Sequence, residues 1–169
     1  MKNFSLLPSI IFLLFGFFSV SIFPQVINTE LNTLVENADI ILTGKVSEKN
    51  SYWNNHKTRI YTDVVIRTDE NLKGNYTGET IRIVTAGGEV GEIGEMYSHT
   101  PRFKDNEEVL LFIKKDDKNN SYKILEGENG KISLIENKIT GEKVTSSNKK
   151  ISTLKKEIKD YVNKKTQQN

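Results

Sequence analysis

The chain has 169 residues, of which 36% are hydrophobic and 27% are charged, and this composition is typical of one folded domain. The sequence contains no cysteine, which excludes disulfide bonds, zinc–thiolate sites, thiol catalysis and a lipid anchor attached to cysteine. The formal net charge of +2 divides unevenly, because residues 22–142 hold 15 Lys and Arg against 20 Asp and Glu, whereas residues 143–169 hold 8 against 2.

The N-terminal residues have the order of segments found in secretory signal peptides. Lys2 is followed by an apolar run over residues 6–18 and then by small residues that end at Ser21. The sequence therefore predicts a signal peptide over residues 1–21 and export to the periplasm, the cell surface or the medium. The alternative is an uncleaved membrane anchor, because the apolar character continues through Phe23.

A short helix and a long strand are the next predicted elements. Residues 26–38 place their apolar side chains on one face of a helix, with Asn28 in the N-cap position. From Ile40 the sequence IILTGKVSEKNSYW alternates and has one apolar face. Gly44 inside this strand predicts a bulge or a sharp coil of the kind that a closed barrel often requires. Trp53 then stands at the edge of a polar loop.

The segment from Arg59 to Ile83, RIYTDVVIRTDENLKGNYTGETIRI, is the centre of the predicted fold. It holds an alternating strand, a Leu-Lys-Gly turn in which Gly74 can adopt a positive φ, and a second alternating strand. We expect this hairpin to be a scaffold, since no candidate chemistry lies on it. Its expected core residues are Ile60, Thr62, Val64, Ile66, Thr68, Ile81 and Ile83.

Residues 86–103, AGGEVGEIGEMYSHTPRF, interrupt the strand pattern. Four glycines and three glutamates lie close together without core periodicity, which predicts an excursion from the sheet with a short strand around residues 90–96. Because glycine, acidic and aromatic residues gather there, we expect the contact surface in this excursion and in the loop at Trp53. The candidate binding residues are Trp53, Gly87, Gly88, Glu89, Glu92, Tyr97, His99, Arg102 and Phe103.

The sequence predicts further strands after the excursion. Five consecutive apolar residues over 109–113 indicate a strand that is buried on both faces. Other strands are expected over 122–125, over 131–135 after an Asn-Gly turn of type I′, and over 138–140 after a two-residue turn.

A basic helix is predicted at the C-terminal end. Its apolar residues form one stripe, and lysines occupy the other face. We expect the stripe to pack on the barrel rather than on anionic lipid, because it is narrow and lacks Trp and Phe. The stripe consists of Ile151, Leu154, Ile158, Tyr161 and Val162. The predicted divisions are a signal peptide (1–21), a domain with an N-terminal helix (22–142), and a basic helix with a frayed tail (143–169).

The order of these motifs along the chain resembles that in known protein families. NADIILTGKV, IYTDVVIRTDENLKG, AGG, PRF and VLLFI follow one another as similar motifs do in a group of bacterial secreted proteins, and more distantly in the netrin-like domain of tissue inhibitors of metalloproteinases. The resemblance covers about residues 30–135. It implies a mainly β fold, namely a five- to seven-stranded antiparallel barrel of OB or netrin-like type with an amphipathic helix at each end. The animal inhibitors chelate the protease zinc through an N-terminal cysteine, which this chain lacks, so no inhibitory residue is carried over.

Neither a catalytic site nor a bound cofactor or metal is expected. His56 and His99 are the only histidines and stand in loops, whereas a metal site needs three or four converging ligands. The glycines from Gly87 to Gly94 lack the Gly-x-Gly start and the following helix of a dinucleotide site. No Gly-x-Ser-x-Gly sequence occurs. Nucleic-acid binding is not expected either, because the predicted barrel is acidic and exported.

We therefore expect a non-catalytic, exported binding module with a protein partner in the cell envelope or outside the cell. The alternative from another class is a peptidase inhibitor, which follows from the resemblance in fold alone. A third hypothesis is a hydrolase with an unrecognised site that depends on His99. Contact with a membrane is expected only through an uncleaved signal peptide.

Overall fold

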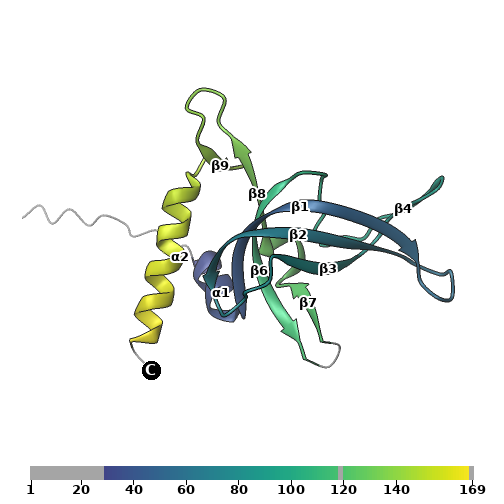
Figure 1. The fold of residues 1–169 in the computed structure, drawn as a ribbon, viewed down its shortest axis with the longest axis horizontal. Coiled ribbons are helices and arrows are strands. Elements are labelled where there is room, and N and C mark those ends of the chain that lie inside the picture. The colour runs from purple at the N-terminus through teal and green to yellow at the C-terminus, as the bar shows by residue number, and fades with distance from the viewer. Residues whose placement is uncertain (1–28, 118–119, 168–169) are drawn as a thin grey trace, which may run out of the picture.

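The computed structural model describes residues 29–117 and 120–167 of the chain (Figure 1). These residues are mainly β, with nine strands in antiparallel sheets and one α-helix at each end of the described chain. The predicted signal peptide, residues 1–21, and the predicted N-cap Asn28 lie outside the described residues. No helix in this part of the chain combines the length and the apolar character needed to cross a membrane.

The elements largely coincide with the predicted ones. In chain order they are α1 (Thr29–Asn37), β1 (Ile40–Trp53), β2 (Ile60–Lys73), β3 (Thr80–Ala86), β4 (Gly88–Val90), β5 (Ile93–Glu95), β6 (Glu108–Asp116), β7 (Ser121–Ile124), the 3-10 helix η2 (Gly127–Gly130), β8 (Lys131–Glu136), β9 (Lys143–Thr145) and α2 (Ile151–Thr166). The predicted first helix, long first strand and central hairpin are confirmed, since α1, β1, β2 and β3 lie where the periodicity places them.

Seven strands form one sheet, in which β3-β2-β1-β6-β8-β9 follow one another and β7 pairs with β6 beside this order. β6 pairs with β8 through its first half and with β7 through its second half. β4 and β5 form a separate hairpin. The large sheet curls until β3 lies alongside β7. No ladder in residues 29–117 and 120–167 joins these two strands, so the sheet is open and the closed barrel stays a prediction.

Irregularities in β1 help to bend the sheet. The ladder between β1 and β2 shifts register at three places, one of them between Thr43 and Gly44. A Cβ at Gly44 would lie only 2.4 Å from the carbonyl oxygen of Arg67, so this close approach requires glycine. The irregularity predicted at Gly44 is confirmed. Bulged strands of this kind bend and twist more strongly than regular ones.

The inner core lies on the concave side of the curled sheet. Alternate residues of β1, β2, β3 and β6 supply its side chains, together with Phe103 from the excursion. The inner core contains Ile40, Leu42, Val46, Val64, Ile66, Ile81, Ile83, Phe103, Val109, Leu111 and Ile113. The predicted core residues of the central hairpin are all buried except Thr68, which is half-buried.

An outer core lies on the convex side, beneath the two helices (Figure 1). It contains Leu31, Leu34, Val35, Ala38, Ile41, Leu72, Leu110, Phe112, Leu154 and Ile158. β6 is therefore buried on both faces over residues 109–113, as its apolar run predicts. The expectation of a single apolar face is wrong for the start of β1, because residues 40–44 are buried on both faces. The helices cover the side that was expected to face solvent.

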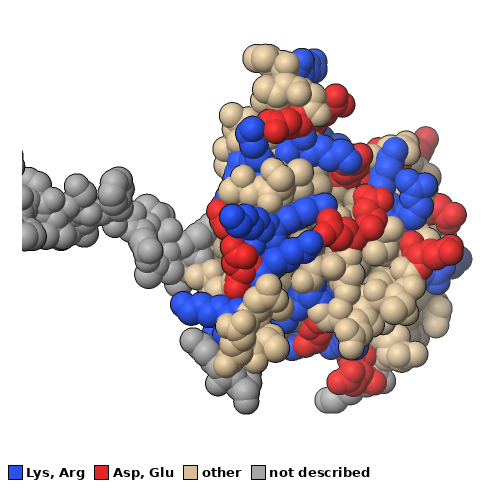
Figure 2. Space-filling model, turned by 60° about the vertical axis from the view of Figure 1, so that its left-hand side comes forward, with Lys and Arg blue, Asp and Glu red and all other residues tan. Residues whose placement is uncertain are grey.

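Helix α2 packs on the sheet as predicted, and its lysines pair with acidic side chains of other elements. Lys155 and Lys159 each lie 2.7 Å from the carboxylate of Glu70 on β2. Hydrogen bonds from these two ammonium groups lower the pKa of Glu70. Lys165 lies 3.0 Å from the carboxylate of Glu36 on α1. Figure 2 shows acidic side chains directly beside the basic ones on this side of the molecule.

The last strand pair differs from the expectation. The strand predicted over residues 138–140 is wrong, and β9 pairs with β8 after a longer turn. Asn137 explains the difference, because its Oδ1 accepts the backbone N–H groups of Ile139 and Thr140 at 2.9 and 3.3 Å and turns the chain there. The type I′ turn expected at Asn129-Gly130 is likewise absent, and these residues end η2 instead.

We predict that Ile158→Ala lowers the free energy of unfolding by about 3 kcal/mol. Ile158 is fully buried in the outer core, so its truncation leaves a cavity between α2 and the sheet. Chemical denaturation followed by circular dichroism measures the change. Thr153→Ala, on the exposed side of α2, is the control and should change the free energy by less than about 0.5 kcal/mol. Equal losses from both variants would contradict this packing of α2.

Candidate functional site

The hairpin of β1 and β2 extends beyond the rest of the sheet and forms an arm. β1 pairs with β6 only over residues 40–45, whereas its ladder with β2 continues to Trp53. Residues 86–105 lie against this arm (Figure 1). The arm, the end of β3 and these residues enclose a hollow of about 630 Å³. This volume lies within the range of small-molecule and cofactor sites.

The hollow has a floor of strand residues and walls from the excursion. The floor residues are Lys49, Ser51, Thr62, Val64 and Thr85. One wall contains the double glycine and residues 94–97, and the other contains residues 100–103 and Asp105. The hollow is therefore built from segments that are distant in the sequence.

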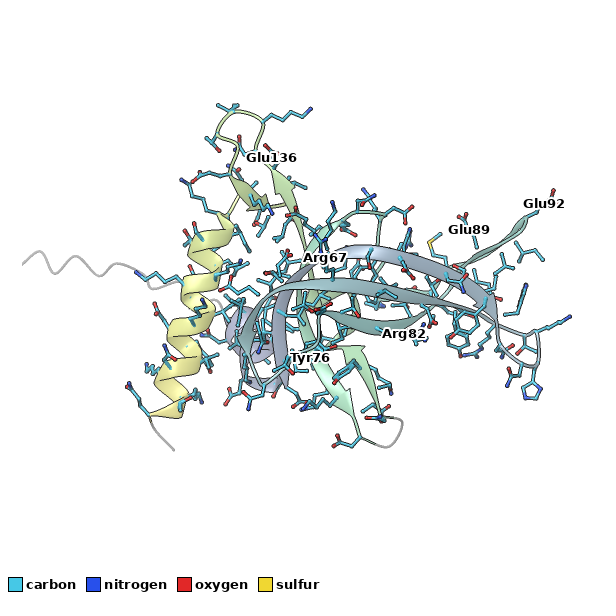
Figure 3. All side chains as sticks on the ribbon, viewed as in Figure 1. Arg67, Tyr76, Arg82, Glu89, Glu92 and Glu136 are labelled. Atoms are coloured by element: carbon cyan, nitrogen blue, oxygen red, sulfur yellow. The ribbon has the colours of Figure 1, made fainter. Side chains whose placement is uncertain are left out.

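Six of the nine candidate binding residues line the hollow. They are Gly87, Gly88, Glu89, Tyr97, Arg102 and Phe103. The other three do not line it. Trp53 lies at the end of β1, and Glu92 lies at the tip of the hairpin formed by β4 and β5 (Figure 3). His99 is exposed and contacts η2, because its carbonyl oxygen accepts the backbone N–H of Glu128 at 3.0 Å.

The excursion contains a hairpin where a single short strand around residues 90–96 is predicted. β4 and β5 pair with each other and form no part of the large sheet. Figure 3 shows Glu89 and Glu92 on this hairpin, which projects from the end of the arm. Ile93 and Met96 are 53% and 71% exposed, and Met96 borders the hollow. The excursion is therefore folded, and it presents apolar surface beside the hollow.

The double glycine turns the chain from β3 onto the inner face of the arm. Gly87 has a φ of +88° and Gly88 a φ of +137°, which L side chains rarely adopt. A Cβ at Gly88 would lie 2.2 Å from Thr62 Oγ1 and 2.5 Å from Ser51 Oγ. The excursion packs against these two hydroxyls only because position 88 carries no side chain.

A chain of hydrogen bonds crosses the floor of the hollow. Thr62 Oγ1 donates to the carbonyl oxygen of Gly87 at 2.7 Å and lies 2.8 Å from Ser51 Oγ. Because Thr62 has one hydroxyl proton and Gly87 accepts it, Ser51 must donate to Thr62. Thr85 Oγ1 makes a longer bond of 3.4 Å to the carbonyl oxygen of Thr62. All three hydroxyl protons are therefore used within the protein.

Glu95 fastens β5 to the arm. Its Oε2 accepts the backbone N–H of Ile60 and the hydroxyl of Tyr97, both at 2.9 Å. The bond from Tyr97 raises the pKa of the tyrosine hydroxyl, because deprotonation would remove the donor and place a second negative charge beside the carboxylate. These bonds hold the wall that Glu95 and Tyr97 form in one position over the hollow.

Lys49 ties the opposite wall to β1. Its Nζ donates to the carbonyl oxygen of Phe103 at 3.0 Å and lies 3.2 Å from the carboxylate of Asp105. The Asp105 side chain is 78% exposed, so this ion pair adds little stability. The two contacts hold the ammonium group of Lys49 between the floor and this wall.

A buried ion pair supports the same wall from behind. The side chains of Glu107 and Lys131, each 9% exposed, are 2.7 Å apart. Glu107 also accepts the hydroxyl of Ser133 at 2.6 Å and the backbone N–H of Lys104 at 2.8 Å. Burial raises the pKa of Glu107, but these bonds lower it more, so the pKa lies below the ordinary carboxyl value. Lys131 Nζ lies 5.2 Å from the ring centre of Phe103, which connects the network to the hollow.

Sequence reasoning misses most of the floor. Lys49, Ser51 and Thr85 of the floor and Glu95 of the wall belong to no predicted site, and Thr62 is predicted as a core residue. The alternation of a strand does not distinguish these floor residues from core residues. An inward-facing side chain recurs at every second position, whether it packs in the apolar core or borders a hollow. One signal could have found two of the floor residues: Thr62 and Thr85 are polar residues on the inward, largely apolar faces of their strands. Such a residue marks where the core ends.

The hollow has mixed charge. Two basic and three acidic side chains line it, namely Lys49, Arg102, Glu89, Glu95 and Asp105. Arg102 contacts Met96 Sδ at the exposed side. In the described ranges of the chain, no three side chains of His, Asp or Glu gather closely enough to hold a metal ion.

Comparison with protein-family models matches no family to this chain, and comparison with curated proteins finds no similar sequence. The geometry of the hollow therefore carries the functional argument.

We predict that Gly88→Ala destabilises the fold by about 2 kcal/mol. The new Cβ would meet Thr62 Oγ1 and Ser51 Oγ at a φ that disfavours alanine. Gly91→Ala is the matched control, because Gly91 also has a positive φ, +64°, but no atom lies within 4 Å of its Cβ position. The control should cost only about 1 kcal/mol. Thermal and chemical denaturation measure both, and equal effects would contradict the close packing at Gly88.

We predict that acid weakens the fold through Glu107. Its pKa is lower in the folded chain, so the carboxylate stabilises the fold above its ordinary pKa, and this contribution is lost as the pH falls through the lower folded-state pKa. Glu107→Gln should remove this part of the pH dependence. It should also cost about 3 kcal/mol at neutral pH, because Lys131 is left buried without a partner charge.

Denaturation curves from about pH 7 to pH 3 test the prediction on Glu107. The control is Glu108→Gln, which breaks a more exposed ion pair with Lys143 and should cost less than about 1 kcal/mol. If Glu107→Gln and the unchanged chain lose stability equally as the pH falls, the assigned role of Glu107 is wrong.

Proposed function

We propose that this protein is an exported, non-catalytic binding module that takes its ligand in the hollow at the β1–β2 arm. The observation that carries the proposal is the hollow itself, with about 630 Å³ of space and floor hydroxyls fixed by internal hydrogen bonds. Concave sites with a few oriented polar groups are typical of ligand binding. The proposal includes the signal peptide over residues 1–21, and hence a location in the periplasm, on the cell surface or in the medium.

The finer fold that we propose is a partly open barrel of OB or netrin-like type. β1, β2, β3, β7 and β6 follow one another around it, and β6 pairs again with β1. Where β3 lies alongside β7, the rings of Tyr76 and Tyr122 meet edge to face with centroids 5.7 Å apart. Five strands in a partly open barrel are typical of the OB fold. These contacts support the netrin-like interpretation.

The hydroxyls of the hollow favour binding over nucleophilic catalysis. A nucleophilic serine passes its proton to an adjacent base, most often a histidine. Ser51 instead donates to Thr62, whose own proton is held by the carbonyl oxygen of Gly87. His56 and His99 are exposed, and neither lines the hollow. This arrangement leaves Ser51 without an activating base.

The partner that we propose is a protein, because the hollow borders a projecting hairpin with apolar surface. Met96 and Ile93 are large, exposed side chains at this place. The hairpin of β4 and β5 extends away from the body of the molecule (Figure 1). A projecting hairpin is also a shape that enters the cleft of a peptidase, which favours peptidase inhibition as the second candidate function.

We predict that a photoreactive residue at Met96 cross-links the partner in the producing cells, whereas one at Lys156 on α2 does not. Both positions are exposed, but only Met96 borders the hollow. Mass spectrometry of the cross-linked product measures the yield and identifies the partner. Arg102→Ala, at the exposed side of the hollow, should reduce the yield at Met96 by about fivefold or more.

Equal yields at Met96 and Lys156, or a yield that Arg102→Ala leaves unchanged, would contradict binding in the hollow. Where the partner is a peptidase, its residual activity in the presence of excess module decides between the two functions. Full activity assigns binding alone, and lost activity assigns inhibition.

A further inference from the structure

The hydroxyl groups on the floor of the hollow offer lone pairs and no free protons. The hydroxyls of Ser51, Thr62 and Thr85 each donate to an oxygen of the protein. Tyr97 on the wall does the same toward Glu95. Each hydroxyl oxygen keeps acceptor capacity after it has donated its proton. A ligand that forms hydrogen bonds with these hydroxyls must therefore bring the donors.

The charges around the hollow favour the same kind of ligand. Lys49 and Asp105 compensate each other at 3.2 Å. Of the remaining charged side chains in the lining, Arg102 is basic, and Glu89 and Glu95 are acidic. The lining therefore has one more acidic than basic side chain. Across the described residues, neither Glu89 nor Oε1 of Glu95 has a hydrogen-bond or ion-pair partner. The uncompensated charge is negative.

A ligand that only accepts hydrogen bonds would form none with the floor hydroxyls, because its lone pairs would face their lone pairs and repel them. An anion would find Arg102 at the exposed side and Lys49, whose charge Asp105 already compensates, but no free hydroxyl proton on the floor. A primary ammonium group carries three donors and a positive charge. An alkyl stem behind it would contact the apolar surface of the rings of Tyr97 and Phe103, which line the walls.

We propose that the hollow binds a primary ammonium group on an alkyl chain, supplied by a lysine side chain of the partner protein. The inference deepens the proposed function and rests on it. Small diamines carry the same group on the same kind of chain, so the test has to separate the two sources.

The full chain, labelled with nitrogen-15, is titrated with three probes and followed by two-dimensional NMR. The probes are acetyl-glycyl-lysyl-glycine amide, the matched peptide with norleucine in place of lysine, and cadaverine. We expect the lysine peptide to shift the amide signals of Ser51, Gly87 and Gly88 and to bind about tenfold more tightly than the norleucine peptide. Weaker binding of cadaverine than of the lysine peptide supports the protein source. Tighter binding of cadaverine would support an ammonium ligand but contradict a lysine side chain of a protein as its source.

Two serines of β1 provide matched variants. Ser51→Ala removes a floor acceptor and should weaken binding of the lysine peptide about fivefold, with no effect on the norleucine peptide. Ser47→Ala removes an exposed hydroxyl outside the hollow, bonded to the carbonyl oxygen of Val65, and should leave both affinities unchanged.

Equal affinities for the lysine and norleucine peptides, or no shifts at about 10 mM lysine peptide, would overturn the ammonium proposal. If cross-linking at Met96 still depends on Arg102 in that case, the proposed binding function stands, and the ligand belongs to another chemical class. Loss of both results would reject the hollow as a binding site.

Discussion

At Gly44 the backbone of β1 approaches the carbonyl oxygen of Arg67 so closely that a Cβ would lie 2.4 Å from it. This contact and the register shift between Val46 and Glu48 lie where β1 separates from β6. There the sheet divides into a part with a core on each side and an arm that extends past it. The helices cover the first part and the excursion packs against the second, so the outer core and the hollow both depend on this division.

Burial explains which elements could be predicted from the sequence. β2 and β3 bury mainly one face, so apolar and polar residues alternate along their sequences and identify them as strands. The start of β6 buries both faces, so its sequence is a continuous apolar run. The position of β9 is not predicted. Residues 138–140 have the sequence pattern of a strand, but hydrogen bonds to the Asn137 side chain place them in a turn. The approach of β3 to β7 is a tertiary contact, and no local pattern encodes it.

The excursion could be located from the sequence, but the floor of the hollow could not. Glycine and glutamate without core periodicity indicate where the chain leaves the sheet, and the walls that this excursion forms hold most of the predicted site residues. Thr62 and Thr85 follow the same alternation as core residues, and their polarity alone does not show that the arm extends past the core and places them beside a hollow. Glu92 and His99 share the composition of the excursion, yet the hairpin tip and the contact with η2 place them outside.

The contacts that hold the walls of the hollow differ in strength, and this difference bears on how the proposed ligand would enter. The ion pair of Glu107 with Lys131 is buried, whereas that of Lys49 with Asp105 is open to water. The wall is therefore fixed at its base and adjustable at its rim, since exposed ion pairs exchange readily with solvent. The floor hydroxyls need no rearrangement, because their protons are already bound within the protein. Binding of the proposed ligand would then displace water from a few lone pairs and from two carboxylates, and the donors of an ammonium group would replace those hydrogen bonds directly.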